Sequence, residues 1–153
     1  MKEFNIEERV EKAKRLFKEG GYNCCQAVVL AYSDLFGLEE ETAAAISSGF
    51  GGGMGRMREV CGAVSGMVII YNILHGNSDI SDKDAKDAHY AKIQSIAKKF
   101  EAETGSIICR TLLNLDKDAA TPPQSENRTE KYYQQRPCAD LVEIAAKILE
   151  AEL

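Results

Sequence analysis

The chain has 153 residues, with 19 basic and 24 acidic side chains and a net charge of −5. This length can bury a hydrophobic core without disulfides, and we expect a single domain over residues 1–153. The acidic balance and the lack of any basic run or zinc-finger spacing argue against a nucleic-acid partner. The longest apolar stretch falls short of the ~20 residues that cross a bilayer, so we expect no membrane insertion.

The N-terminal residues predict both a first helix and a cellular location. Charged and apolar side chains alternate there, without the uninterrupted apolar segment of a secretory signal, which predicts a cytoplasmic protein. The pattern ends at Gly20-Gly21, as expected at the end of a helix. The apolar residues follow three- and four-residue spacing, and they are Ile6, Val10, Ala13, Leu16 and Phe17.

Three further helices are predicted before residue 76. Asn23 is a good N-cap for a helix over CCQAVVLAYSDLF, which Gly37 ends. EEETAAAISS predicts a short helix with acidic residues in its first turn, where the helix dipole favours them. The glycine-rich segment 49–55 is expected to be a loop, and the next helix runs from about Arg58 to His75.

The second half of the chain continues the helical pattern. Asp79 or Ser81 is expected to cap a long helix that ends at Gly105, and Ser106 to cap a short one over IICRTLL. Segment 114–136 is polar and contains two prolines, which predicts an irregular loop with a turn around KYYQQ. Pro137 suits the first turn of a last helix. The sequence therefore predicts an all-α bundle of about six or seven helices, with a long irregular loop before the last one.

Four of the five cysteines are predicted to lie at or near helix N-termini: Cys24, Cys61, Cys109 and Cys138. Unpaired amides and the helix dipole stabilise a thiolate there. If successive helices run up and down, the first three of these cysteines begin helices at the same end, and the long loop can return the fourth to it. The alternative is that each cysteine is a small buried filler. The fifth, Cys25, is expected to pack inward while its neighbour faces the shared site.

The spacings between the four cysteines are 37, 48 and 29 residues, so none of the local metal-binding motifs is present. A shared site must then be assembled by the tertiary structure. GFGGGMG matches neither a dinucleotide-binding nor a P-loop pattern. Its exposed amides could instead bind an anion such as phosphate, thiolate or sulfide, with Arg56 and Arg58 adding positive charge. The candidate cofactor-binding residues are Gly51, Gly52, Gly53 and Arg56.

Together, YNCCQAVVLAY, CGAVSG, CRTLL and the late Cys138 resemble the C_GCAxxG_C_C family. Its members are short redox-active proteins with four cysteines and a CGAxxG motif, and the resemblance covers residues from about 13 to 150. The resemblance implies that the family cysteines are Cys24, Cys61, Cys109 and Cys138. Cys25 stands where members more often have alanine.

Two interpretations of a cysteine site stay open on the sequence. The first is a redox protein, with an oxidoreductase as its enzymatic form, that acts in thiol–disulfide exchange or electron transfer; Cys24 and Cys61 react, and Cys109 and Cys138 are resolving thiols or further ligands. The second is a metal-binding module in which all four thiolates hold zinc or an iron–sulfur cluster. The first requires a redox partner, which the sequence does not identify. Glycine-lined helix faces would also permit a homodimer.

Overall fold

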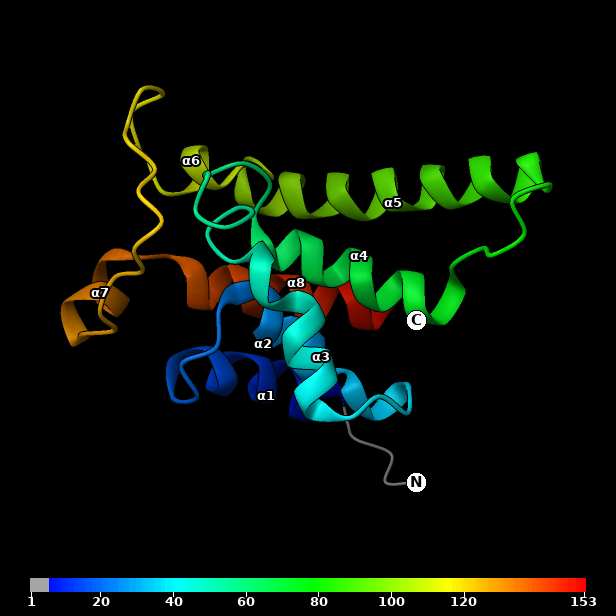
Figure 1. Ribbon diagram of the computed structural model, residues 1–153, viewed down its shortest axis with the longest axis horizontal. Coiled ribbons are helices and arrows are strands. Elements are labelled where there is room, and N and C mark those ends of the chain that lie inside the picture. Colours follow the sequence, from blue (N-terminus) through cyan, green and yellow to red (C-terminus); the bar gives the residue numbers. More distant parts are fainter. Residues whose placement is uncertain (1–5) are drawn as a thin grey trace.

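The computed structural model describes residues 6–153 of the chain. Residues 1–5 and the side chain of Ile6, which the apolar pattern included, lie outside this description. The described chain forms eight α-helices and two short 3₁₀ segments (Figure 1). The helices are α1 (Ile6–Lys18), α2 (Cys24–Ala31), α3 (Glu40–Ser47), α4 (Gly62–His75), α5 (Lys83–Thr104), α6 (Cys109–Leu112), α7 (Glu130–Gln135) and α8 (Cys138–Glu152).

The all-α prediction is confirmed for residues 6–153, which contain no β-strand, but the helices number eight rather than six or seven. The additional helix is α7, where a turn around KYYQQ was expected. Thr129 caps it by accepting a hydrogen bond from the amide of Tyr132. No helix within this described range is long and apolar enough to cross a membrane.

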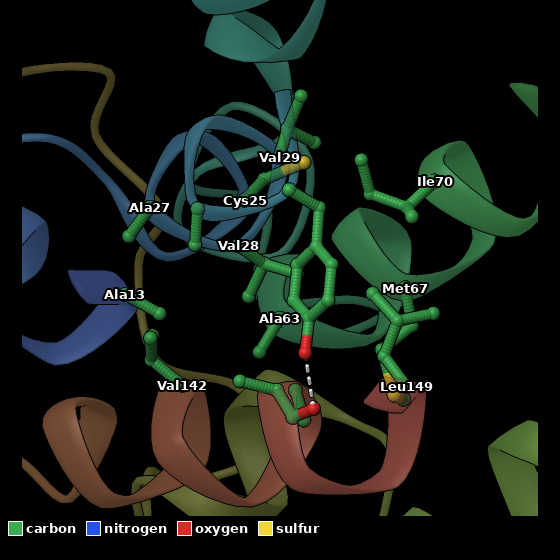
Figure 2. Packing of buried hydrophobic residues seen from close by; sticks show 14 of the residues in the cluster. Ala13, Cys25, Ala27, Val28, Val29, Ala63, Met67, Ile70, Val142 and Leu149 are labelled. Carbon is green, nitrogen blue, oxygen red and sulfur yellow. Dashed lines mark hydrogen bonds between the residues drawn. The ribbon is translucent and has the colours of Figure 1, made fainter. Parts of the chain in front are cut away.

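Helix α2 lies at the centre of the core and contacts α1, α3, α4 and α8. Six of its eight residues are buried, which explains why its sequence is apolar on every side. Figure 2 shows Cys25, Val28 and Val29 on this helix facing side chains of α4 and α8. Tyr32, directly after α2, is fully buried and donates its hydroxyl hydrogen to the carbonyl of Ala146. The contacts that α2 makes with four other helices hold the whole helix in place, and with it Cys24 at its first position.

Glycines allow α2 and α4 to approach closely, as their spacing in the sequence suggested. A Cβ added at Gly66 would lie 2.8 Å from the Cβ of Val28, which is closer than side chains tolerate. A Cβ added at Gly62 would overlap the sulfur of Cys24. Gly66 therefore serves helix packing, whereas Gly62 leaves room for a thiol.

Three predicted helix starts were wrong by a few residues. The fourth helix begins at Gly62 rather than near Arg58, so Cys61 is its N-cap and does not lie in its first turn. The long helix is capped by Asp82, whose carboxylate accepts from the amide of Ala85, and not by Asp79 or Ser81. The helix expected after Ser106 begins only at Cys109.

The late start of α4 has a tertiary cause. Val60 and Ile108 form an isolated antiparallel bridge. The amide of Cys61 donates to the carbonyl of Ile107 at 2.8 Å, and the amide of Cys109 donates to the carbonyl of Glu59 at 2.6 Å. These amides pair with a distant segment, so both segments stay extended until the bridge has ended.

The second predicted helix also ended early, at Ala31 instead of Phe36. Residues Ser33–Leu35 form a 3₁₀ turn, and the hydroxyl of Ser33 donates to the carbonyl of Leu30. Such side-chain bonds compete with continuation of an α-helix.

Candidate functional site

Cys24, Cys61, Cys109 and Cys138 line one cavity of about 50 Å³. They come from the starts of α2, α4, α6 and α8, which the connections bring to one region of the molecule. All five cysteines of the chain are free thiols. The remaining lining residues are Phe17, Asn23, Gly52, Arg58, Gly62, Leu112, Leu113, Arg128, Tyr132, Arg136 and Leu141.

Cys24 is the first residue of α2 and is held there by a complete capping box. The side chain of Asn23 accepts from the amide of Gln26, while the side chain of Gln26 accepts from the amide of Asn23. Asn23 also donates from its side-chain amide to the carbonyl of Ser48, at 2.9 Å. The same residue therefore caps α2 and ties its start to the glycine-rich loop.

The antiparallel bridge between Val60 and Ile108 places Cys61 opposite Ile107 and Cys109 opposite Glu59, so the two cysteines lie on either side of the bridge. One cysteine directly follows each bridge residue, and the paired amides fix their register. Gly53 has φ +69 and lies against Cys109 and Glu59, and a Cβ there would come within 2.7 Å of the Cβ of Cys109. Glycine is required at this position both by the left-handed backbone and by the adjacent cysteine.

The long segment before α8 carries Cys138 back to the cavity through Arg128. The guanidinium of Arg128 donates to the carbonyls of Phe17 and Tyr22, both at 3.2 Å. It also lies over the ring of Phe17, 4.4 Å from the centroid. Tyr133 adds an edge-on contact with Phe17 at 6.0 Å. This end of the segment is therefore anchored to α1, although residues 121–129 form no helix, as predicted.

Cys24 is the one cysteine whose pKa is lowered, whereas the pKa values of the other four are raised. A hydrogen bond from the thiol of Cys61 lowers the pKa of Cys24 from its ordinary value to about 6, against the opposing effect of burial. The amides of Gly52, Cys25 and Cys24 itself add to the stabilisation. Cys24 is therefore mostly a thiolate at neutral pH, and it is partly exposed.

The pKa of the partner thiol, Cys61, shifts in the opposite direction. The hydrogen bond to Cys24, burial and the charge on Cys24 all raise the pKa of Cys61 well above its ordinary value. The amides of Ala63 and Val64 oppose this shift. A thiolate and a protonated thiol share one hydrogen bond, so the pair carries one negative charge.

The other two thiols of the cavity stay protonated. Burial raises the pKa of Cys109, although the guanidinium of Arg58, 3.7 Å from its sulfur, acts to lower it. Burial and the charge on Cys24 raise the pKa of Cys138 to about 12. These two are therefore weaker nucleophiles than Cys24 in the structure as it stands.

Cys25 does not line the cavity. It is fully buried in the core between α2 and α4, and burial raises its pKa. Figure 2 shows its side chain beside Val29 of the same helix. Of the two adjacent cysteines, Cys24 thus faces the cavity and Cys25 packs inward.

The glycine-rich loop has an unusual backbone, because six of its residues have positive φ: Gly52, Gly53, Met54, Gly55, Arg56 and Arg58. Several amides of this region are already paired within it. Those of Met54, Arg56 and Arg58 donate to carbonyls of the same loop. The amide of Gly52 instead stabilises the Cys24 thiolate. The anion that this loop contacts is therefore the thiolate of Cys24.

The candidate cofactor-binding residues are divided between two surfaces. Gly51, Gly52 and Arg56 line a second, wider cavity beside the cysteines, whereas Gly53 packs under Cys109. As the side chains lie, no three His, Cys, Asp or Glu residues within the described part of the chain are placed to hold a metal ion.

Sequence reasoning missed the residues that the long polar segment contributes. Glu126, Arg128, Tyr132 and Arg136 surround the two cavities. The signal that could have found them is the combination of tyrosines and arginines in one segment, which resembles a folded surface more than a solvated linker.

A family model matches residues 22–152, and its description reads "Putative redox-active protein (C_GCAxxG_C_C)". The match covers most of the chain, so the protein belongs to the C_GCAxxG_C_C family. Searches among curated proteins and among solved structures found no match to this chain.

Proposed function

We propose that this protein carries out dithiol–disulfide exchange, with Cys24 as the nucleophile and Cys61 as the resolving thiol. The observation that carries the proposal is that Cys24 and Cys61 line the same cavity, and their interaction there shifts their pKa values in opposite directions. Exchange requires one thiolate and one nearby thiol that reacts second. Family membership supports redox activity in general.

The reaction proceeds in two displacements. The Cys24 thiolate attacks one sulfur of a substrate disulfide, which forms a mixed disulfide and releases the other substrate sulfur as a thiolate. The Cys61 thiol then gives its proton to a released thiolate, and its sulfur attacks the sulfur of Cys24. A Cys24–Cys61 disulfide forms, and the second substrate sulfur departs as a thiolate that takes its proton from solvent. Two electrons pass from the pair to the substrate disulfide.

Residues around Cys24 and Cys61 assist the exchange reaction. The amide of Gly52 lowers the pKa of Cys24 before attack. The missing side chain of Gly62 leaves the sulfur of Cys24 uncovered on that side. Cys109 and Cys138 line the same cavity and can accept the disulfide from the first pair by further exchange.

Mapping of the disulfide tests this proposal directly. Trypsin places Cys24, Cys61, Cys109 and Cys138 in four different peptides, but leaves Cys25 on the same peptide as Cys24. The experiment therefore uses a Cys25→Ala background, oxidised with a small disulfide and analysed by mass spectrometry. We expect a Cys24–Cys61 link that persists when Cys109 and Cys138 are both replaced by serine. A link that never includes Cys24 would overturn the proposal.

The second candidate is a metal-binding module, and the observation that favours it is the convergence of four cysteines on one cavity. Zinc or an iron–sulfur cluster would require the thiols to move closer together than they lie here. Anaerobic purification followed by iron, sulfide and zinc analysis tests it. Stoichiometric metal that protects all four thiols from iodoacetamide supports the module, and metal-free protein with four reactive thiols contradicts it.

A further inference from the structure

A second cavity, of about 280 Å³, opens beside the cysteine cavity. We call it the arginine groove, because Arg56, Arg58 and Arg128 line it. The two cavities share Asn23, Gly52, Arg58, Arg128 and Tyr132 as lining residues. The groove therefore adjoins the cavity that the thiols line.

Three guanidinium groups converge on one carboxylate oxygen beside this groove. Oε1 of Glu126 lies 2.5 Å from Arg136, 3.3 Å from Arg56 and 3.9 Å from Arg58. Two of these arginines belong to the glycine-rich loop and the third follows α7, so chain segments far apart in sequence build the cluster.

The cluster holds more positive charge and more donors than Glu126 can satisfy. One carboxylate faces three guanidinium groups, whose side chains are only 11–17% exposed, whereas Glu126 itself is 44% exposed. Nη1 of Arg56 is buried and has no hydrogen-bond partner among the residues described. A buried donor without a partner costs about 1–3 kcal/mol, so an additional acceptor at this place would be favourable.

The backbone of the loop is held in a conformation that presents these arginines. Arg56 and Arg58 have φ of +70° and +64°, a region that costs a residue with a side chain about 1–2 kcal/mol. Their amides donate to the carbonyls of Gly51 and Gly52, which fixes the turn. Strain of this kind persists when the surrounding structure enforces it, and it is common at binding sites.

We infer that the arginine groove binds the carboxylate of a small anionic disulfide, and that Glu126 occupies the place of that carboxylate in the free protein. This inference rests on the proposed function, because it names the substrate class of the same exchange reaction. The arginines hold the anionic end of the substrate, and the disulfide lies toward Cys24. Attack and resolution then follow the two displacements given above, with the anionic disulfide reduced to two thiols.

Three disulfide probes that differ in charge test the inference: dithiodipropionate is anionic, hydroxyethyl disulfide is neutral and cystamine is cationic. The rate of Cys24–Cys61 oxidation is measured with each at neutral pH and divided by the rate of a free small thiol with the same probe. We expect the anionic probe to exceed the neutral one by about tenfold or more, since a charged cleft raises association rates by 10–10³. Cystamine should be slowest.

Two variants and one control locate the effect. Arg56→Gln should lower the anionic-to-neutral rate ratio several-fold, and Glu126→Gln should raise it by removing the competing carboxylate. Arg15→Gln removes the same charge from an exposed position outside both cavities and should leave the ratio unchanged.

The outcomes separate the two claims. Oxidation of the Cys24–Cys61 pair at equal relative rates by all three probes overturns the anionic substrate and leaves the proposed function standing. The same holds if Arg15→Gln and Arg56→Gln lower the ratio equally. If no probe oxidises the pair, the proposed function fails and the inference fails with it.

Discussion

Replacement of Gly62 by alanine should disrupt the cysteine site by filling the space that the sulfur of Cys24 occupies. The added Cβ would overlap this sulfur and would lie 2.9 Å from the carbonyl oxygen of Phe50 and 3.2 Å from the amide nitrogen of Cys25. The two backbone atoms cannot move away, so Cys24 must rotate. Overpacking of this kind costs about 1–3 kcal/mol. We expect Gly62→Ala to lower the free energy of unfolding by about 2 kcal/mol.

The rotation should also change the chemistry of Cys24. Its sulfur would leave the amide of Gly52 and the thiol of Cys61, the groups that lower its pKa. Urea unfolding measures the stability, and the pH dependence of Cys24 alkylation measures the pKa.

Gly49→Ala is the matched control, because a Cβ at Gly49 would meet nothing within 4 Å. That variant should be neutral or up to about 1 kcal/mol more stable than the native protein. If Gly62→Ala matched Gly49→Ala in stability and kept the native reactivity of Cys24, the reasoning would be refuted.

Three further predictions concern the thiols. Cys61→Ala removes the donated hydrogen bond and should return the pKa of Cys24 toward its ordinary value, measured by alkylation rate against pH; an unchanged profile would contradict this. Near neutral pH, Cys24 is protonated in the unfolded chain but not in the folded one, because its pKa is lowered in the folded state. The free energy of unfolding should therefore rise by about 1 kcal/mol for each unit by which the pH increases around neutrality. This contribution is lost as the pH falls through about 6, and urea titrations should show no such slope in Cys24→Ser. Cys25→Ala should cost about 1 kcal/mol through a small core cavity, yet leave oxidation of the Cys24–Cys61 pair unchanged.

The sequence predicts the parts of the site that local interactions determine. The start of α2 follows from Asn23 and the apolar run after it, because a capping box involves residues only three apart. The association of Cys24, Cys61, Cys109 and Cys138 with helix starts could be recognised in the same way, with errors of a few residues.

Features that depend on distant segments could not be read from the sequence. The bridge between Val60 and Ile108 joins residues 48 positions apart, and neither segment alternates long enough to predict a strand. The six-residue helix α7 is too short to be stable alone, and its tyrosines pack around Arg128 and Phe17. The opposite pKa shifts of Cys24 and Cys61 arise from their contact in space, which no spacing along the chain encodes.

The pH dependence of Cys24 alkylation tests the central claim most directly. In a Cys25→Ala background, the rate of reaction with iodoacetamide at Cys24 is followed by mass spectrometry between acidic and alkaline pH. A poised thiolate predicts a midpoint at about 6 and a plateau through neutral pH. A midpoint near 8.5, the value of an unperturbed cysteine, would contradict the account.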